Sequence, residues 1–485
     1  MLRKIPPVLW LVLPLAYVLY VYHLDAAGLL GPDEPRYAAV ARDMARTGDW
    51  VTPHLWGQPW FEKPALLYWM VAGGFRVGLG PELAPRLPIA LLSLGFLAFY
   101  WWILRREFGT LAASFATLIL GTCAGWVAYS QVGVTDLPLA ATLSAAMLLA
   151  LPWMAKGDTR WLPAAAAFLG LAVLAKGLVP LVLAVPLVLR GRIRDLMRWR
   201  VVAPFCIVAL PWYVLCYLRN GRTFLDVFFG QQTFGRFYSL ELLHGQPWWF
   251  YIPVLLAGLL PWTPLVGLLA RRGGLRDPRR VFLAAWFVFG LVFFSVAANK
   301  LPGYLLPLLP AVTALLGIGL DEIEKPAPWL AACAVLLVAF PIAARILPLA
   351  VVNGLTHVRW PSLEWTWFLA VPAAAAVWML AHREQRLSAA LVLTVCAGAG
   401  LVYLKVTALP KVPSARALWR EMSGRTSEFC LDGVQRNWRY GLNYYSVVPL
   451  PDCEQEPRRL SVRQSAGELP YLASPDATIL PFQNY

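Results

Sequence analysis

The sequence predicts an all-α polytopic membrane protein that ends in a small polar domain. Three observations predict this class. The 485 residues are 59% hydrophobic and only 14% charged, whereas a soluble domain carries roughly 25% charged residues. Continuous apolar runs of about 18 residues, long enough to cross the hydrocarbon core of a bilayer, recur along the chain. These runs do not alternate polar and apolar residues, as the strands of a transmembrane barrel do.

About 13 apolar segments are expected, all of them before residue 410. They are residues 6–24, 87–104, 111–130, 137–155, 161–175, 177–190, 201–218, 248–269, 281–298, 303–320, 327–345, 365–381 and 388–408. We therefore expect one membrane domain over residues 1–410, with a large outer loop at residues 25–86. Residues 411–485 are too polar for lipid and predict a small α/β domain, with a helix at 414–422 and strands at 442–448 and 477–482.

Basic residues between the segments predict the orientation of the chain. With Arg3 and Lys4 in the cytoplasm, alternation also places the basic clusters at residues 190–200 and 271–280 there, as the positive-inside rule requires. An odd number of spans then leaves the C-terminus outside. The net charge of +15 follows this placement, so we expect no nucleic-acid partner.

Two cysteines differ from the other five of the chain. Those five lie inside apolar segments, where cysteine packs as a small hydrophobic residue. Cys430 and Cys453 lie in the polar C-terminal stretch. Because that stretch is expected outside the cytoplasm, where disulfides persist, this pair is a candidate disulfide.

The outer loop contains the stretch GPDEPRYAAVARDMARTGDW at residues 31–50. Its apolar residues fall at helical spacing on one face: Tyr37, Val40, Ala41 and Met44. The polar residues fall mostly elsewhere, so the pattern predicts an amphipathic helix lying on the membrane surface.

Asp33 and Glu34 stand between two prolines at the start of this expected helix. Two interpretations remain open for the pair. A carboxylate at a helix start accepts backbone N–H groups and suits the helix dipole. A carboxylate held rigidly at the mouth of a cavity acts as a general base on a hydroxyl group.

Other ionisable residues at the outer membrane face also need a reason, because a charge near lipid costs free energy. Asp136, at the start of segment 137–155, either caps that helix or faces the same cavity as Asp33. Three lysines lie on the outer face against the positive-inside trend: Lys63, Lys176 and Lys300. They fit a lipid-borne phosphate, and snorkelling is the alternative.

Four further residues complete the candidates. Glu62 precedes Lys63, and Tyr304 lies four residues after Lys300, which places the two on one helical face. Arg236 has the fork geometry that suits a phosphate. His244 is more typical of a hydrogen-bonded loop residue than of a metal ligand. Nucleotide-binding loops, zinc motifs and serine-nucleophile motifs are not found in the sequence.

At these motifs the chain resembles the GT-C membrane glycosyltransferases. Within them it resembles the branch of the aminoarabinose lipid A transferases and the bacterial relatives of the protein O-mannosyltransferases. The resemblance rests on GPDEPRYAAVARDMARTGDWVTPHLWGQPWFEKPALLYWM at 31–70, VGVTDLPLA at 132–140, LAKGLVPLVL at 174–183, HGQPWWFYIPVLLAGLLPWTPL at 244–265 and NKLPGYLLPLLPA at 299–311. It implies inverting transfer of a sugar from a polyprenyl (undecaprenyl) phosphate donor to a lipid acceptor, such as lipid A or another glycolipid. The reaction would take place at the periplasmic face of a bacterial inner membrane.

The resemblance also implies roles for single residues. Asp33 matches the principal catalytic carboxylate, Asp136 a second acidic residue, and Lys63 the lysine at the donor phosphate. Further residues around the donor phosphate would be Arg36, Lys176, Arg236 and Lys300. The substrate cavity would be lined by Glu34, Tyr37, Glu62, His244 and Tyr304. Two departures from the aminoarabinose transferases leave the sugar open: residues 231–237 lack their Glu-His pair, and Trp60 replaces a tyrosine. No cofactor is required, and a divalent metal remains open.

Three alternatives remain open, one within the same enzyme class and two in other function classes. The acceptor is a protein hydroxyl, as for the protein O-mannosyltransferases. The protein is a transporter or flippase of lipid-linked sugars, which moves its substrate without bond cleavage. Or it is a structural or receptor membrane protein in which Asp33 only caps a helix. The sequence does not indicate the sugar, the acceptor or the oligomeric state.

Overall fold

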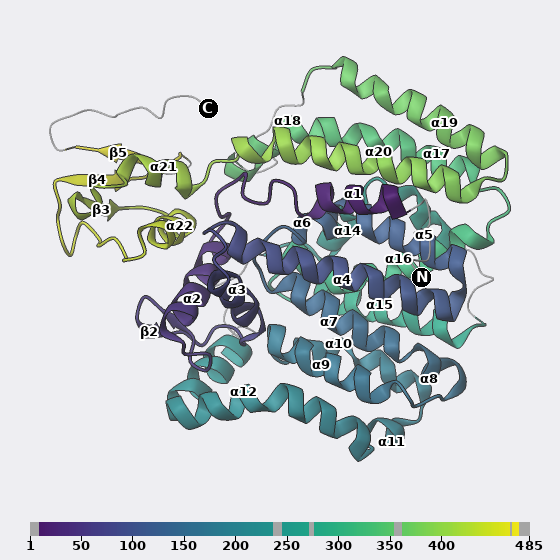
Figure 1. Cartoon of the computed structure of the whole chain (residues 1–485), viewed down its shortest axis with the longest axis horizontal. Helices are drawn as coiled ribbons and strands as arrows, with labels where there is room; N and C mark the ends of the chain where they lie inside the picture. Colours follow the sequence, from purple (N-terminus) through teal and green to yellow (C-terminus); the bar gives the residue numbers. More distant parts are fainter. Residues whose placement is uncertain (1–8, 236–244, 271–275, 354–360, 466–467, 475–485) are drawn as a thin grey trace, which may run out of the picture.

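The computed structural model describes residues 9–235, 245–270, 276–353, 361–465 and 468–474. Most of these residues are helical, and the long helices run side by side as a bundle (Figure 1). Eight described helices are long and apolar enough to span a membrane, and the bent pair Trp248–Gly258 and Thr263–Ala270 makes up to nine. The chain is therefore a multi-pass membrane protein, as predicted.

The first half of the membrane domain is ordered as follows. Its elements are α1 (Leu9–Tyr20), α4 (Leu83–Phe108), α5 (Thr110–Thr122), α6 (Ala124–Tyr129), α7 (Asp136–Leu149), α8 (Leu151–Lys156), α9 (Leu162–Lys176), α10 (Val179–Leu183), η1 (Val185–Arg190), α11 (Ile193–Leu196), α12 (Trp199–Leu225) and the π-helical η2 (Asp226–Gly235). In this half, α7 packs against both α4 and α9. These contacts bury every residue of the apolar stretch of α7 and α8.

The second half continues the bundle. Its elements are η4 (Trp248–Phe250), α14 (Tyr251–Gly258), η5 (Thr263–Ala270), α15 (Pro278–Val296), η7 (Pro302–Leu308), α16 (Leu309–Glu322), α17 (Ala327–Val335), η8 (Leu336–Val338), α18 (Ala339–Asn353), η10 (Trp365–Leu369), α19 (Ala370–His382), α20 (Arg386–Thr407) and η11 (Leu409–Lys411). The expected segments that are too short to count as spans coincide with α1, α5, α9 and the stretch Val179–Leu189. The count of about 13 spans stays a prediction.

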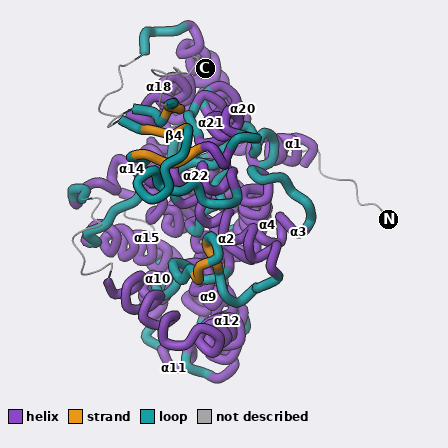
Figure 2. The backbone as a smooth tube through the Cα atoms, turned by 90° about the vertical axis from the view of Figure 1, so that its left-hand side faces the viewer, coloured by secondary structure: helices purple, strands orange, loops and turns teal. Residues whose placement is uncertain are grey.

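The outer loop and the C-terminal elements lie at one end of the bundle. Figure 1 places α2, α3 and the C-terminal elements at its left-hand end, and α8 and α11 at its right-hand end. Figure 2 looks onto the first of these ends and shows α22 and the strands beside α2. The outer loop and the C-terminal region therefore share one end, although they are far apart in sequence.

The outer loop folds into α2 (Asp33–Thr47), the hairpin strands β1 (His54–Leu55) and β2 (Gln58–Pro59), and α3 (Leu66–Arg76). The apolar face predicted for α2 is correct, since Tyr37, Val40, Ala41 and Met44 are all at most 2% exposed. The predicted place of this face on the membrane surface is wrong. It packs against α3, β1 and α22, so protein and not lipid covers it.

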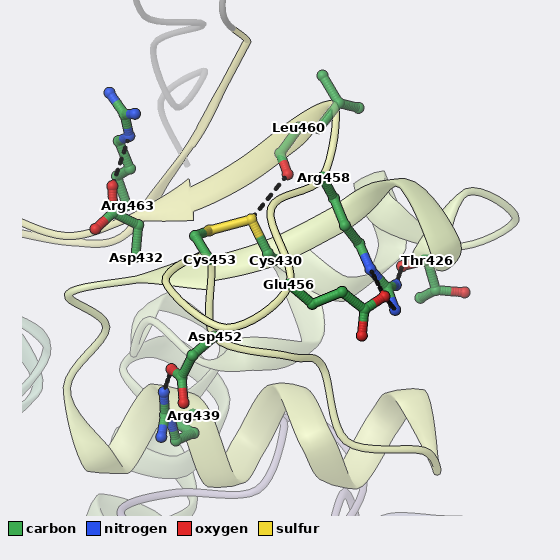
Figure 3. The surroundings of a disulfide bond; sticks show 10 residues. All are labelled: Thr426, Cys430, Asp432, Arg439, Asp452, Cys453, Glu456, Arg458, Leu460 and Arg463. Atoms are coloured by element: carbon green, nitrogen blue, oxygen red, sulfur yellow. Dashed lines mark hydrogen bonds and ion pairs between the residues drawn. A yellow bond between two sulfur atoms is a disulfide. The ribbon is translucent and has the colours of Figure 1, made fainter.

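The C-terminal elements form a small α/β unit with its own core. They are α21 (Ala415–Met422), η12 (Thr426–Glu428), β3 (Phe429–Asp432), α22 (Arg436–Ser446), β4 (Leu460–Arg463) and β5 (Tyr471–Ala473). The sheet order is β3-β4-β5, with β3 and β4 parallel and β4 and β5 antiparallel. A disulfide joins Cys430 on β3 to Cys453, as the sequence predicts (Figure 3).

Two of the three secondary structures expected in this unit are tested by the structure. The helix expected at 414–422 forms, and Ser414 occupies its N-cap position without a side-chain cap. The strand expected at 442–448 is wrong, because residues up to Ser446 belong to α22. Trp438 and Leu442 are buried four residues apart, and this helical spacing outweighs the strand preference of the aromatic and valine residues that follow. The strand expected at 477–482 lies outside the described residues.

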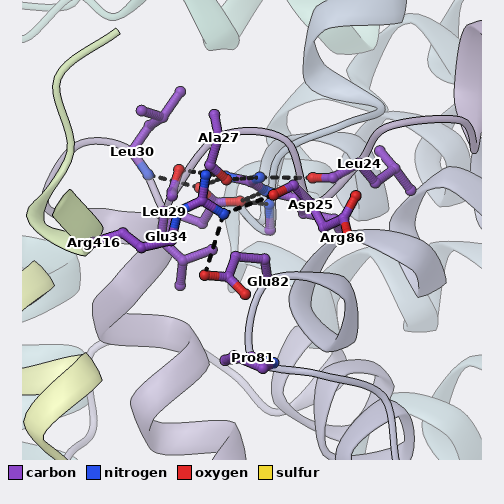
Figure 4. Close-up of polar contacts among 12 residues, drawn as sticks. Leu24, Asp25, Ala27, Leu29, Leu30, Glu34, Pro81, Glu82, Arg86 and Arg416 are labelled. Atoms are coloured by element: carbon purple, nitrogen blue, oxygen red, sulfur yellow. Dashed lines mark hydrogen bonds and ion pairs between the residues drawn. The ribbon is translucent and has the colours of Figure 1, made fainter. Parts of the chain in front are cut away.

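A buried ion pair fastens the start of α2 to the bundle (Figure 4). The Arg86 Nε and Nη2 atoms donate to the two Glu34 carboxylate oxygens at 2.7 and 2.8 Å. Arg86 also donates to three backbone carbonyls, those of Leu24, Ala27 and Gly28. Glu34 accepts from the N–H groups of Leu30 and Gly133. One pair thus joins the chain before α2, the start of α4 and the turn before α7.

We predict that Glu34→Ala lowers the free energy of unfolding by about 3–5 kcal/mol, because it leaves the Arg86 guanidinium buried without its carboxylate. The measurement is the unfolding midpoint of the purified protein in detergent. Asp43→Ala is the matched control, since it removes the partner of Arg46, whose side chain is 75% exposed. Equal stability of the two variants would show that the buried pair does not hold the fold together.

We also predict that Cys430→Ser destabilises the C-terminal unit by about 3 kcal/mol, since the disulfide closes a loop of 23 residues. Limited proteolysis of this unit, with and without a reducing agent, measures the effect. Cys396→Ser serves as control, because Cys396 is a free thiol. Identical cleavage rates for Cys430→Ser and the wild type would contradict the prediction.

Candidate active site

Asp33 is the first residue of α2, and its carboxylate is fixed by a residue one turn later. Arg36 Nη2 lies 2.5 Å from Asp33 Oδ1. The Asp33 side chain keeps 46% exposure, whereas that of Arg36 is only 2% exposed. The N-cap interpretation of this acidic pair is wrong, because Pro32 occupies the N-cap position and no side chain caps the helix, but both carboxylates lie in the first turn, where the helix dipole favours them. The expected place of Glu34 in the substrate cavity is also wrong, because Glu34 is fully buried. The buried Arg36 guanidinium therefore holds the orientation of the partly exposed Asp33 carboxylate.

Arg36 also binds the loop that follows the hairpin. Its Nη2 lies 3.0 Å from Glu62 Oε2, and Lys63 Nζ lies 3.5 Å from Glu62 Oε1. Burial by itself lowers the pKa of Arg36, but Glu62, followed by Tyr37 and Asp33, raises it, and the net direction is upward. Arg36 therefore stays charged. Four side chains of alternating sign, Asp33, Arg36, Glu62 and Lys63, form one network, which we call the Arg36 network.

Two tyrosines back this network on its buried side. Tyr37 and Tyr68 pack edge to face with ring centroids 6.0 Å apart, and both rings are buried. Burial raises the pKa of both hydroxyl groups, and the nearby charges of Glu62 and Asp33 raise it further. Both tyrosines are therefore neutral hydrogen-bonding groups. Tyr37 lies near Asp33 and Glu62 but is only 2% exposed, so its place in a substrate cavity stays a prediction.

The second acidic candidate is paired with a lysine. Lys176 Nζ, at the end of α9, lies 2.7 Å from Asp136 Oδ1, at the start of α7. The same ammonium lies 4.7 Å from the ring centroid of Tyr304. No side chain caps α7, so the capping interpretation of Asp136 is also wrong. The carboxylate is turned toward Lys176 instead.

Gly303 packs directly onto this pair. A Cβ atom at Gly303 would come within 2.9 Å of Asp136 Oδ1 and 2.8 Å of the Tyr129 hydroxyl. Only a residue without a side chain fits there without displacing the carboxylate. This close approach accounts for the glycine of the NKLPGYLLP motif and for the position of Tyr304 next to it.

The two groups of charges lie near each other. Asp33 and Asp136 both contribute to the electrostatic field at Lys176. Phe61, which precedes Glu62, packs in one cluster with Leu174, two residues before Lys176. The structure thus brings Asp33, Lys63 and the Asp136–Lys176 pair to the same end of the bundle, from four separate parts of the chain.

Three candidates are placed differently from expectation or lie outside the described residues. Lys300 is 6% exposed, and its ammonium donates to the Ala297 carbonyl at 2.7 Å. The prediction that Lys300 and Tyr304 share one helical face is wrong. Lys300 lies between the two helices, since α15 ends at Val296 and η7 begins only at Pro302. Arg236 and His244 lie outside the described residues. Within the described ranges, no three His, Cys, Asp or Glu side chains form a group that could hold a metal ion.

Several polar atoms around Arg36 are buried without a hydrogen-bond partner in the part of the chain that the structure describes. They are Arg36 Nε and Nη1, Trp56 Nε1, Trp60 Nε1 and the Tyr68 hydroxyl. An unpaired buried donor costs free energy, so bound water or a ligand is expected to supply the missing acceptors.

Sequence reasoning missed two contributors to the site. Arg86 is the partner of Glu34, and the only signal was an arginine between two prolines in APRLP at residues 84–88. Tyr440 lies over Arg36, 5.2 Å from its Cζ atom to the ring centroid. A sequence separation of about 400 residues hides this contact, although the aromatic stretch RNWRYGLNYYS at 436–446 is a usable signal.

Known proteins resemble this chain in sequence and in fold. A family model described as dolichyl-phosphate-mannose-protein mannosyltransferase matches residues 62–216. An undecaprenyl phosphate-alpha-4-amino-4-deoxy-L-arabinose arabinosyl transferase from Pseudomonas fluorescens is 33% identical over 319 residues, 62% of this chain and 54% of that protein. One from Aeromonas salmonicida is 34% identical over 339 residues, 64% of this chain and 60% of that protein. The chain thus spans little more than half the length of these curated relatives.

A solved structure covers nearly the whole chain. ArnT from Cupriavidus metallidurans bound to undecaprenyl phosphate matches with a TM-score of 0.75 and 24% identity, over 94% of this chain and 93% of that one. Its apo state gives a TM-score of 0.76. These matches show the fold. The resemblance to the aminoarabinose transferases, inferred from the motifs, is confirmed by the sequences of the curated relatives.

We predict that Asp136 and Lys176 are energetically coupled. Asp136→Ala and Lys176→Ala each leave one charge partly buried and unpaired, so the double variant should lose less stability than the two single variants together, by about 1–3 kcal/mol. Unfolding midpoints in detergent complete this double-mutant cycle. The matched control is the exposed pair Asp158 and Arg160, for which we expect no measurable coupling. Additive losses at Asp136 and Lys176 would contradict the prediction.

Proposed function

We propose that this protein is an inverting membrane glycosyltransferase that moves a sugar from an undecaprenyl phosphate donor to a lipid acceptor, such as lipid A or another glycolipid. One observation carries the proposal. The Asp33 carboxylate is half exposed, while the Arg36 that holds it is buried, and Lys63 belongs to the same network. The curated relatives are named undecaprenyl phosphate-aminoarabinose arabinosyl transferases, and this supports the choice of donor.

The residues divide the reaction between them. The bond from the anomeric carbon to the donor phosphate oxygen breaks as an acceptor oxygen forms its bond on the opposite face of the sugar, which inverts the configuration. Lys63 and Lys176 stabilise the charge that grows on the leaving phosphate. Asp33 takes the proton of a hydroxyl acceptor. For a phosphate acceptor no base is needed, and Asp33 orients the acceptor instead.

Arg36 and Glu62 take positioning roles in this proposal. Arg36 is 2% exposed and its Nη2 is already shared by Asp33 and Glu62, so it fixes the base. Glu62 holds Arg36 on one side and Lys63 on the other. Fixed charges that need no rearrangement are what stabilises a transition state most effectively. None of the proposed steps uses a divalent metal.

We place the site and the C-terminal unit in the periplasm of a bacterial inner membrane, with the N-terminus in the cytoplasm. The arrangement of Figure 1 supports this, since α2 and the C-terminal unit lie at one end and α11, within the basic stretch 190–200, lies near the other. The disulfide of the C-terminal unit also fits an oxidising compartment. The periplasm has no ATP, so a lipid-activated sugar suits the location.

A second candidate function follows from the family model. Its description as a protein mannosyltransferase favours a protein hydroxyl as the acceptor. Both candidates use the same donor chemistry and the same base, so they differ only in the acceptor that is glycosylated. A transporter of lipid-linked sugars differs from both, because it leaves the sugar–phosphate bond intact.

We predict that the purified protein in detergent releases free polyprenyl phosphate from a polyprenyl-phosphate sugar in the presence of its acceptor. Asp33→Asn should lower kcat at least a hundredfold towards a hydroxyl acceptor, because the general base is lost, while the unfolding midpoint stays near that of the wild type. The assay uses a panel of sugars with lipid A and serine or threonine peptides as acceptors, read by mass spectrometry.

Asp43→Asn is the control, because it makes the same change in the same helix at an aspartate whose partner is the exposed Arg46. A glycosylated peptide without a glycosylated lipid would select the protein acceptor. Full activity of Asp33→Asn would remove the catalytic assignment. Movement of the intact donor across vesicles, without release of polyprenyl phosphate, would favour transport.

A further inference from the structure

The C-terminal unit reaches the site through one aromatic ring. Tyr440, on α22, lies over the Arg36 guanidinium with its ring centroid 5.2 Å from Arg36 Cζ. Tyr37 and Trp60 lie over the same guanidinium at 5.2 and 5.9 Å. Tyr440 is the only one of these three rings that comes from outside the first 86 residues. The guanidinium that holds Asp33 is thus enclosed by rings from two distant parts of the chain.

The hairpin of β1 and β2, which precedes Glu62, also contacts the Tyr440 ring. The turn Leu55-Trp56-Gly57-Gln58 has a positive φ at both central residues, +53° at Trp56 and +81° at Gly57. Such a turn favours asparagine or glycine at the first of these positions, and a tryptophan there is strained. The Trp56 ring stacks on Tyr440 with centroids 5.6 Å apart and planes 25° apart. This stacking offsets the strain and fixes the place of Tyr440.

Other contacts hold α22 against the outer loop. Arg42 Nη2 donates to the Tyr444 carbonyl at 2.8 Å, and the Tyr444 hydroxyl donates to the Pro81 carbonyl at 2.6 Å. The Tyr445 hydroxyl accepts from the Leu29 N–H and donates to Glu82. None of these contacts uses Tyr440. A change at Tyr440 therefore leaves the docked position of the C-terminal unit in place.

We propose that Tyr440 is a positioning residue of the active site, by which the C-terminal unit fixes Arg36 and, through it, the catalytic carboxylate of Asp33. This inference rests on the proposed function and names a further residue for the same site. The cation–π contact restricts the orientation of the Arg36 guanidinium plane. In this orientation Arg36 Nη2 donates to Asp33 Oδ1 at 2.5 Å. Loss of the ring lets the guanidinium turn, so Asp33 is no longer aimed at the acceptor.

The test compares two substitutions at one position. Tyr440→Leu replaces the ring with a smaller aliphatic side chain, and we expect kcat for sugar transfer to fall about tenfold with KM for the donor unchanged. Tyr440→Phe keeps the ring, and its kcat should equal that of the wild type. Tyr471→Leu, in β5 of the same unit, is the matched control and should leave kcat unchanged. The unfolding midpoint of all three variants should stay close to that of the wild type.

A second measurement does not depend on activity. Phenylglyoxal reacts with arginine, and peptide mass spectrometry gives its rate at Arg36. We expect at least tenfold faster labelling of Arg36 in Tyr440→Leu than in the wild type or Tyr440→Phe, because the ring no longer covers the guanidinium. Unchanged labelling, an unchanged kcat in Tyr440→Leu, or equal losses in the Leu and Phe variants would each overturn the inference. A wild-type protein that releases no polyprenyl phosphate would instead overturn the proposed function, and the labelling would still decide the role of Tyr440.

Discussion

The ion pair between Glu34 and Arg86 is the constraint on which the position of the site depends. Its seven hydrogen bonds, two between the partners and five to the backbone, are distributed over the segment before α2, the start of α4 and the turn at Gly133. Since both side chains are almost fully buried, the pair is favourable only when all of these bonds form together. That cooperativity fixes the first turn of α2 relative to the membrane helices, and Asp33 lies in that turn.

Two adjacent carboxylates take opposite roles because of helix geometry. Successive residues of a helix point about 100° apart, so Glu34 points into the bundle when Asp33 points toward the rim. Asp33 then meets the residue three positions later, Arg36, on the same face. The buried residue that anchors the helix and the exposed carboxylate beside it could not be exchanged without turning the helix. Consequently the acidic pair is one structural unit with a buried half and an exposed half.

Sequence reasoning reached the parts of this arrangement that depend on local pattern. The apolar segments, the helix at Asp33–Thr47 and its buried face follow from periodicity, and the small C-terminal unit follows from composition. It did not reach what depends on long-range packing. Glu34 and Arg86 are 52 residues apart, and Tyr440 is about 400 residues from Arg36, so no local pattern indicates either contact. The same limit explains α22, since a short aromatic stretch favours strand and helix alike until its neighbours are known.

The charges of the site are already paired within the protein, and this has a consequence for an anionic donor. Lys63 interacts with Glu62 and Lys176 with Asp136, so each lysine has a carboxylate partner before any phosphate arrives. A phosphate that enters must therefore compete with these carboxylates for the two ammonium groups. Because a lysine carries a compact charge on a flexible stem, each can turn from its carboxylate to the phosphate with little movement of the backbone. Arg36, enclosed by three rings and two carboxylates, has no such freedom. In the proposed reaction, Arg36 would be the fixed cation that holds the base, and Lys63 and Lys176 would be the cations that follow the leaving phosphate.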